Sequence, residues 1–337
     1  MVSIIIPVYN TRLDDLQRCI ASVLAQSVDD LEILIIENGS REDCARAVDE
    51  VAASDERIKV FHRQNEGVSV ARNFGTEQAA GDYVLYVDAD DLLEKTAVED
   101  GLRAAEAIGC DVVIGKIDKT AVLLDTPVDT KPNGGYTLLD TREKRDAFRA
   151  HIFTKADPAY RFEDGTLFNG EGCWAHLIKR ETALKLKFPE GVAVGEDTIW
   201  ALDMIDKGIS ICLSDKLWYY YIQNDYSVLS KYNPHIVEQL TQPVERLSPV
   251  YLNAEAPIYC AYMRWILSKL KQISYRYFLA AENTASNREK RREFKNMISA
   301  SPWKETLRGR SCLSLKVRLR LFLYRHYLML TVFRFKK

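Results

Sequence analysis

The 337-residue sequence has few histidines and no closely spaced cysteines. Its five histidines and seven cysteines are scattered along the chain, and no two cysteines form a C-x-x-C pair. Zinc sites and disulfide frameworks depend on closely spaced Cys or His residues, so the sequence disfavours both. We therefore expect the cysteines to be reduced thiols and the protein to be cytoplasmic.

Long apolar runs are also missing. No uncharged apolar stretch approaches the eighteen or so residues that a membrane helix requires, and the first residues lack the basic start and apolar run of a signal peptide. Hydrophobic residues nevertheless make up 47% of the chain and charged residues 28%, which is typical of a folded globular protein and excludes global disorder. We expect a chain that does not cross a bilayer.

Acidic residues are absent from the C-terminal tail. Residues 306–337 hold nine Lys or Arg and no Asp or Glu, which leaves residues 1–305 with 37 basic and 48 acidic residues. A net charge of about −11 disfavours nucleic acid as a partner of the main body. The tail combines its cations with Leu, Phe and Tyr, which predicts peripheral contact of residues 306–337 with an anionic membrane surface. A packed helical pair with a basic rim, or a homodimer contact, is the alternative.

The first 115 residues alternate short β-branched runs with helical patterns. The expected strands are 2–6, 32–37, 58–62, 83–87 and 112–114, and the expected helices are 14–26, 42–54, 69–79 and 95–108. This alternation predicts an α/β fold with a mostly parallel sheet and helices on both faces. Residues 235–337 show mainly helical spacing and predict a helical C-terminal region.

Two familiar phosphate-binding signatures are absent. No G-x-G-x-x-G follows the first expected strand, and the chain has no G-x-x-x-x-G-K-[ST]. A dinucleotide-binding dehydrogenase and a P-loop protein are therefore disfavoured. Pro7-Val8-Tyr9 offers instead a rigid turn and an aromatic face for a base, and Glu37 offers an acceptor for a base N–H.

Three acids crowd the end of the fourth expected strand, in Asp88-Ala89-Asp90-Asp91. Such carboxylates repel one another unless a hard divalent cation lies among them, and Mg²⁺ or Mn²⁺ can bridge carboxylates to a diphosphate. The sequence therefore predicts a nucleotide-diphosphate site at this edge of the sheet. The alternative is a solvated turn in which Asp90 or Asp91 caps the next helix.

A long ordered set of motifs resembles the inverting nucleotide-sugar glycosyltransferases of family 2, which have a GT-A type fold. The matching segments are Pro7 to Asn10, Leu24 to Ser27, Glu37 to Ser40, Asn65 to Gly75, Gly81 to Tyr83, Val87 to Asp91, Trp174 to Arg180, Phe188 to Glu190 and Glu196-Asp197. The resemblance covers roughly residues 1–230. One position departs from the pattern, because Glu37 stands where the family usually has Asp.

The resemblance implies three regions and a set of donor-side roles. It implies a nucleotide-sugar-binding half at 1–117, an acceptor-binding half at 118–234 and a helical region with a basic tail at 235–337. Asp90 would bind Mn²⁺ or Mg²⁺, and Asp88 would lie near the ribose or the donor sugar. Arg72 would lie near the nucleotide, with an ion pair to the acidic cluster as the alternative. The remaining nucleotide-binding candidates are Pro7, Val8, Tyr9, Glu37 and Gly67.

The acceptor side is implied by the later motifs. An inverting transfer needs a base for the proton of the attacking hydroxyl, and the resemblance gives this role to Asp197, with helix N-capping as the alternative. Glu196 would orient the donor sugar or the acceptor. Trp174 and His176 are candidates for contact with a sugar ring, and core packing is the alternative for Trp174.

The expected activity is transfer of a sugar from a nucleotide-diphosphate donor, with UDP favoured, to a glycan or lipid-linked acceptor in bacterial surface polysaccharide synthesis. A nucleotidyltransferase is one alternative, but the basic, Gly-rich phosphate loop that would favour it is absent after the first strand. A catalytically silent sugar-binding or scaffolding subunit is another, but such a subunit need not retain Asp90 and Asp197.

Overall fold

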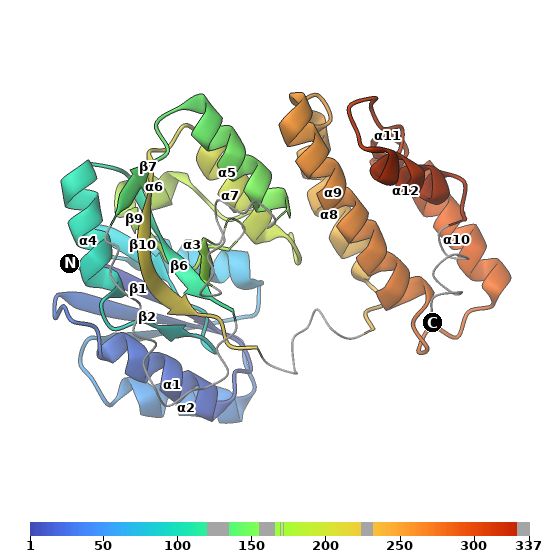
Figure 1. Ribbon diagram of the computed structural model, residues 1–337. Helices are drawn as coiled ribbons and strands as arrows, with labels where there is room; N and C mark the ends of the chain where they lie inside the picture. The colour runs from blue at the N-terminus through green and yellow to red at the C-terminus, as the bar shows by residue number, and fades with distance from the viewer. Residues whose placement is uncertain (120–134, 155–165, 169, 171, 224–231, 329–337) are drawn as a thin grey trace. The chain divides into compact units, whose positions relative to one another are not determined.

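The structure is a computed structural model that describes residues 1–119, 135–154, 166–168, 170, 172–223 and 232–328 (Figure 1). The chain divides into two compact units. Unit 1 comprises Met1–Phe148 and Lys155–Gln223, and unit 2 comprises Arg149–Thr154 and Asn224–Lys337. In the described ranges, no helix combines the length and apolar character needed to cross a membrane.

A ten-stranded mixed sheet forms the centre of unit 1. Its main order is β3-β2-β1-β4-β9-β6-β10-β5, with β7 paired to β10 and β8 paired to β6. Its parallel portion is the run β3-β2-β1-β4 together with the β6–β10 pair. The strands are β1 Val2–Val8, β2 Leu31–Asn38, β3 Ile58–Arg63, β4 Tyr83–Tyr86, β5 Leu92–Leu93, β6 Val112–Asp118, β7 Tyr136–Leu138, β8 Thr166–Phe168, β9 His176–Lys179 and β10 Ile211–Tyr220.

Helices cover both faces of this sheet, as the composition of the strands requires. The helices of unit 1 are α1 Leu13–Leu24, α2 Glu42–Ala52, α3 Val68–Gln78, α4 Ala97–Ile108, α6 Arg180–Lys185 and α7 Glu196–Asp206, and α5 Arg142–Thr154 begins there. Apart from Ser3, the residues of β1 are apolar, and successive side chains point to opposite sides of the sheet. The strand therefore presents apolar side chains on both faces, and both must be covered. The α/β fold expected from the sequence, with helices on both faces of the sheet, is confirmed.

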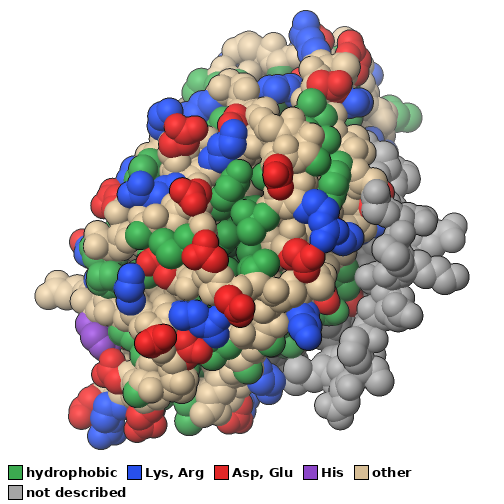
Figure 2. All heavy atoms as spheres, turned by 90° about the vertical axis from the view of Figure 1, so that its left-hand side faces the viewer, with side chains coloured by type: hydrophobic (Ala, Val, Ile, Leu, Met, Phe, Trp, Pro, Cys, Tyr) green, Lys and Arg blue, Asp and Glu red, His purple; other side chains and the backbone are tan. Residues whose placement is uncertain are grey.

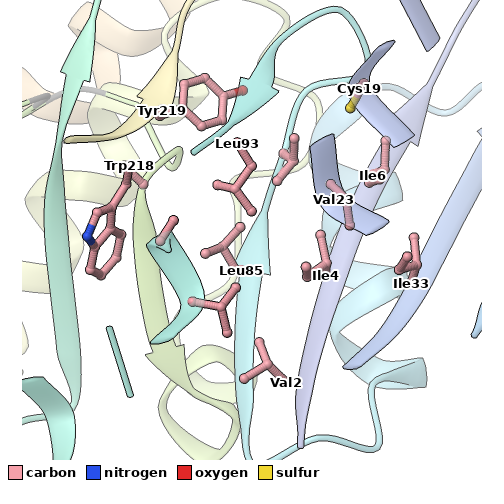
Figure 3. Packing of buried hydrophobic residues seen from close by; sticks show 14 of the residues in the cluster. Val2, Ile4, Ile6, Cys19, Val23, Ile33, Leu85, Leu93, Trp218 and Tyr219 are labelled. Atoms are coloured by element: carbon pink, nitrogen blue, oxygen red, sulfur yellow. The ribbon is translucent and has the colours of Figure 1, made fainter. Parts of the chain in front are cut away.

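The two faces of β1 pack against different helices. Val2, Ile4 and Ile6 belong to one buried cluster with Val23 of α1 (Figure 3). Ile5 points to the other face, where α3 approaches so closely that a Cβ on Gly75 would lie 2.5 Å from the Ile5 Cγ2 atom. The glycine of the sequence motif is therefore required by close packing of a helix on the sheet.

The main differences from the sequence-based expectation lie after residue 114. Strand β9 enters antiparallel between β4 and β6, and the ten-residue strand β10 lies outside the expected strands. Both features depend on partners distant in sequence, so local patterns did not reveal them. No strand or helix was expected from the sequence in residues 118–170, but their described part contains β7, α5 and β8. Residues 120–134 and 155–165 lie outside the described ranges.

Unit 2 is helical, as expected. It contains the end of α5, α8 Ile236–Tyr251, α9 Ala256–Ile273, the short π-helix η2 Ser274–Phe278, α10 Asn287–Ser299, α11 Trp303–Thr306 and α12 Leu315–Arg325. An aromatic cluster forms its core, because the Phe153 ring makes edge contacts with Tyr251, Tyr262 and Trp265 at centroid distances of 4.8, 5.3 and 5.9 Å.

The charges on the visible surface are mixed. Figure 2 shows one face of the molecule on which red acidic and blue basic side chains are interspersed among apolar ones. Residues 306–328, by contrast, contain Lys and Arg but no Asp or Glu.

Candidate functional site

The loops after β1, β2 and β3 meet at one edge of the sheet. The Asn10 backbone N–H donates to the Ser40 hydroxyl over 3.0 Å, and the Arg41 N–H donates to the Asn10 side-chain oxygen over 2.9 Å. Gly39 has a φ of +73°, and a Cβ there would lie 2.6 Å from the Asn65 nitrogen. The polar ends of three strands are thus brought together, as parallel pairing predicts.

Glu37 is buried at this edge and both its carboxylate oxygens have partners. One oxygen accepts from the Ser40 N–H over 2.5 Å, and the other lies 3.3 Å from His62 Nδ1. The second ring nitrogen of His62 lies 2.9 Å from Asp49, and the hydrogen bond to Asp49, followed by that to Glu37, raises the pKa of His62 despite partial burial. His62 was not identified from the sequence, although it lies directly opposite Glu37 in the register of β2 and β3.

The other nucleotide candidates lie at the end of β1 and in the loop that follows β3. Pro7 and Val8 are the last residues of β1, and Tyr9 follows them with its side chain exposed. Gly67 adopts a φ of +94° and caps α3, a conformation that favours glycine.

The acidic turn after β4 separates its three carboxylates into different environments. Asp91 is buried, and it accepts from the Tyr219 hydroxyl and from the Ile222 N–H, each over 2.8 Å. Asp90 is exposed, and Asp88 is half-buried. Burial, with the nearby Asp88 and Asp90 charges, raises the pKa of Asp91 to about 8. Helix α4 has Thr96 as its N-cap, so the alternative of Asp90 or Asp91 as its cap is wrong.

Asp88 is linked to residues far away in the sequence. One of its oxygens lies 2.9 Å from Arg72 Nη2, and the other accepts from the Trp174 indole N–H over 2.5 Å. Its backbone N–H donates to Tyr219 over 3.1 Å. The carboxylate therefore has a fixed orientation before any ligand binds.

Arg72 joins the acidic turn to the start of α7. Its Nη1 atom lies 3.0 Å from Asp197 and 3.6 Å from Glu196, while its Nη2 atom contacts Asp88. The side chain is 3% exposed. Burial disfavours its charge, yet the surrounding anionic groups raise the pKa of Arg72 well above its ordinary value. The sequence offered two interpretations of Arg72, a position near the nucleotide and an ion pair with the acidic cluster. The ion pair, with Asp88, is observed.

Glu196 and Asp197 occupy the first turn of α7. The N-cap of this helix is Gly195, with a φ of +90°, so Asp197 is not the N-cap. Burial raises the pKa of Glu196, and Arg72 opposes that shift. The position favours negative charge because the helix N-terminus carries a partial positive charge.

Trp174 and His176 lie in different surroundings. Trp174 stacks on Tyr219 at a centroid distance of 6.0 Å and binds Asp88, so it forms a wall of the site. His176 is completely buried, and its ring packs edge-on against Trp200. Burial lowers the pKa of His176 to about 4. The observed position of His176 is that of a core residue.

Asn73 links the motif at Asn65 to Gly75 with the motif at Phe188 to Glu190 through hydrogen bonds. Its side chain donates to the Phe188 carbonyl over 3.0 Å and accepts from the Phe188 N–H over 2.8 Å. Asn73 follows Arg72 directly in α3. The helix therefore binds the acids of α7 through Arg72 and the Phe188 backbone through Asn73. Asn73 and Phe188 both belong to motifs that were recognised in the sequence. No local pattern indicated their contact, because it joins residues 115 positions apart.

A comparison with family models decides the classification of this arrangement. Residues 3–162 match the model described as glycosyl transferase family 2. This match places residues 3–162 in glycosyl transferase family 2.

Curated relatives agree with this match. The chain is 43% identical to an uncharacterised glycosyltransferase of Rickettsia conorii over 105 residues, which are 31% of this chain and 17% of the relative. It is 27% identical over 252 residues to the uncharacterised glycosyltransferase EpsJ of Bacillus subtilis, covering 71% of this chain and 66% of EpsJ. The matched segments thus span less than two thirds of each relative.

The fold has a solved counterpart. The S. aureus TarS 1–349 structure in complex with UDP-GlcNAc superposes with a TM-score of 0.64 at 17% identity, covering 97% of this chain and 88% of that one. At this identity the likeness shows the fold alone.

A divalent cation at this site would rely on substrate phosphates as well as on protein carboxylates. Among the described residues, no group of three or more His, Cys, Asp or Glu is arranged to hold a metal ion. Asp91 is engaged by Tyr219 and Ile222, and Asp88 by Arg72 and Trp174, whereas Asp90 is the exposed acid of the turn. Mg²⁺ and Mn²⁺ are commonly held by one or two carboxylates plus substrate phosphates, so Asp90 fits this mode of binding.

Proposed function

We propose that the chain transfers a sugar, with inversion, from a nucleotide-diphosphate donor to a hydroxyl group of a glycan or lipid-linked acceptor. The observation that carries the proposal is the bridge of Arg72 between Asp88 and Asp197. It holds an acid of the donor-side turn and an acid of the acceptor-side helix within one hydrogen bond of the same guanidinium. A base and a nucleotide site are needed side by side for such a transfer.

Asp197 is the proposed base. In the reaction the acceptor oxygen forms a bond to the anomeric carbon while the bond to the diphosphate oxygen breaks, and the electron pair leaves with the diphosphate. Asp197 takes the proton that the acceptor hydroxyl loses. Arg72 would orient this carboxylate through its 3.0 Å contact, and Glu196 would position the sugar. Asp88 and Trp174 would form the wall beside the donor.

The nucleotide would occupy the edge formed by the ends of β1 and β2. Tyr9 presents an exposed aromatic face there, and Pro7, Val8 and Gly67 shape the backbone around it. Glu37 is the proposed acceptor for a base N–H, supported by its fixed orientation toward Ser40 and His62. UDP is the proposed nucleotide, supported by the UDP-GlcNAc complex of TarS.

Asp90 is the proposed ligand of Mn²⁺ or Mg²⁺. When bound, such an ion would neutralise charge that develops on the departing diphosphate. The proposed setting is bacterial surface polysaccharide synthesis, with peripheral contact of residues 306–337 with an anionic membrane surface.

Hydrolysis of a panel of nucleotide sugars, with and without Mn²⁺, tests the donor side. We expect turnover of one donor that is lost on metal removal and in Asp90→Asn, and retained in Asp43→Asn, which changes an exposed acid on α2. Turnover that survives both metal removal and Asp90→Asn would overturn the metal assignment.

Transfer to an acceptor tests the base. Asp197→Asn keeps an oxygen that can accept from Arg72 but cannot take a proton, so we expect transfer to fall by about 10²–10⁴-fold. Donor binding, measured by calorimetry, should change little. A transfer rate close to that of the wild type would assign the proton to another group.

A further inference from the structure

A surface pocket of about 280 Å³ lies in unit 2, remote in sequence from the residues of the proposed active site. It is lined by the loop Leu307–Ser311 and by α12. Four of its lining residues are arginines: Arg308, Arg310, Arg318 and Arg325. Within the described part of the chain, none of the four forms an ion pair with an acidic residue. Four neighbouring guanidinium groups repel one another, and an anion in the pocket would offset that repulsion.

The pocket is built by specific local contacts. Gly309 adopts a φ of +66°, and a Cβ there would lie 3.2 Å from the Leu321 Cδ1 atom, so the loop lies directly on α12. Arg310 donates to the Ala254 carbonyl over 2.7 Å, and its guanidinium lies 4.6 Å from the centroid of the Tyr259 ring. Arg318 and Arg325 are seven residues apart and therefore lie on the same side of the helix.

An apolar ridge runs along α12 beside this pocket. We use this name for Leu315, Leu319 and Phe322, which are 80%, 56% and 52% exposed and follow helical spacing. The opposite face of the helix is buried through Val317, Leu321 and Tyr324. With 3.6 residues per turn, Arg318 and Arg325 flank the ridge on one side, and Lys316 and Arg320 flank it on the other.

We propose that this face of unit 2 binds an anionic bilayer surface, with a phospholipid phosphate in the arginine pocket and the apolar ridge inserted among the lipids. Arginine is suited to this role because its planar guanidinium can bind a phosphate through two parallel hydrogen bonds. An exposed apolar stripe between basic flanks is the pattern of helices that lie in the membrane interface.

Charge complementarity selects this occupant. Residues 306–337 hold nine basic residues and no acidic one, so two copies of this face would repel each other. The cytoplasmic leaflet carries anionic lipids, which attract basic residues that lie near its surface. The proposal concerns unit 2 and stands independently of the chemistry proposed for unit 1.

Flotation of the full-length chain with vesicles tests the surface. We expect binding to vesicles of phosphatidylcholine mixed with phosphatidylglycerol, weak or no binding to phosphatidylcholine alone, and release at high salt. Equal binding to both kinds of vesicle, or to neither, would overturn the proposal. Self-association without lipid that Phe322→Ser abolishes would assign the ridge to a second copy of the chain, and would also overturn it.

Two matched variants test the pocket itself. Arg318→Lys and Arg320→Lys make the same change two residues apart on α12, and both keep the net charge. We expect Arg318→Lys to weaken binding to anionic vesicles about fivefold because a two-pronged phosphate contact is lost, and Arg320→Lys to weaken it less than about twofold. Equal effects would show delocalised attraction without a pocket. Circular dichroism and donor hydrolysis should stay unchanged in both variants, which separates this test from failure of the proposed function.

Discussion

Arg72 is the residue on which the geometry of the proposed site depends. A lysine in its place would keep the positive charge, but a single ammonium could not make the 2.9 Å contact to Asp88 and the 3.0 Å contact to Asp197 in the same fork. We expect Arg72→Lys to lower the transfer rate at least about tenfold, since a misplaced catalytic group loses orientation.

Removal of the Arg72 charge should also destabilise the fold. Arg72→Met leaves partly buried carboxylates without their cation, and loss of one partner of a fully buried pair costs about 3–5 kcal/mol, which is the upper bound here. Chemical denaturation measures this loss, and Arg103→Lys, in an exposed pair with Glu99, is the control. Wild-type transfer by Arg72→Lys would show that Arg72 does not position Asp197.

His176 gives the stability of the protein a pH dependence. Its pKa is lowered to about 4 by burial, so the folded chain binds fewer protons than the unfolded chain, whose histidine has a pKa of about 6.5. The stabilisation is complete above about pH 6.5 and is lost as the pH falls toward 4, by at most about 3 kcal/mol.

The variant His176→Asn should flatten this dependence. Denaturation curves between pH 7 and pH 5 should show a smaller loss of unfolding free energy than in the wild type, whereas His235→Asn, at an exposed position, should keep the wild-type slope. An unchanged slope in His176→Asn would assign the pH dependence to other groups.

At the scale of single elements, the close approach of α3 to the sheet can be tested directly. Gly75→Ala would place a methyl group 2.5 Å from Ile5 Cγ2 and 3.2 Å from Ile36 Cγ1, so the helix must shift outward. We expect a loss of about 1–3 kcal/mol in unfolding free energy. Because α3 carries Arg72 and Asn73, transfer should fall as well. Gln78→Ala, at an exposed position on the same helix, is the control. Unaltered stability in Gly75→Ala would show that the helix is not held this closely.

The elements that could be predicted from the sequence are those with local signals. Strands β1 to β4 and the helices between them were predicted within a few residues, because each shows its own apolar period and turn residues. Strand β9 was missed because it is only four residues long and is defined by antiparallel partners on β4 and β6.

The same distinction applies to the site. The acids at the strand ends could be predicted because parallel strands bring their carboxyl ends to one edge. The Arg72–Asp197 pair joins residues 125 positions apart, and the hydrogen bond from Tyr219 to Asp91 joins residues 128 apart. No local pattern encodes such contacts. The same holds for the burial of Asp91, because the solvated turn was only the alternative interpretation of this segment and neither interpretation indicated a buried acid.

At the scale of the whole molecule, the two units have separate cores and should respond differently to mutation. Phe153 lies in the aromatic core of unit 2 with Tyr251, Tyr262 and Trp265, whereas the proposed active-site residues belong to unit 1. Phe153→Ala removes a large buried ring, which typically costs about 3–5 kcal/mol. We expect unit 2 to unfold at a lower temperature, seen as an early calorimetric transition, while donor hydrolysis persists below the second one. Phe61→Ala, in unit 1, should have the converse effect, because its ring packs on Phe74 of α3. A single transition that shifts equally in both variants would show that the two cores unfold as one cooperative body.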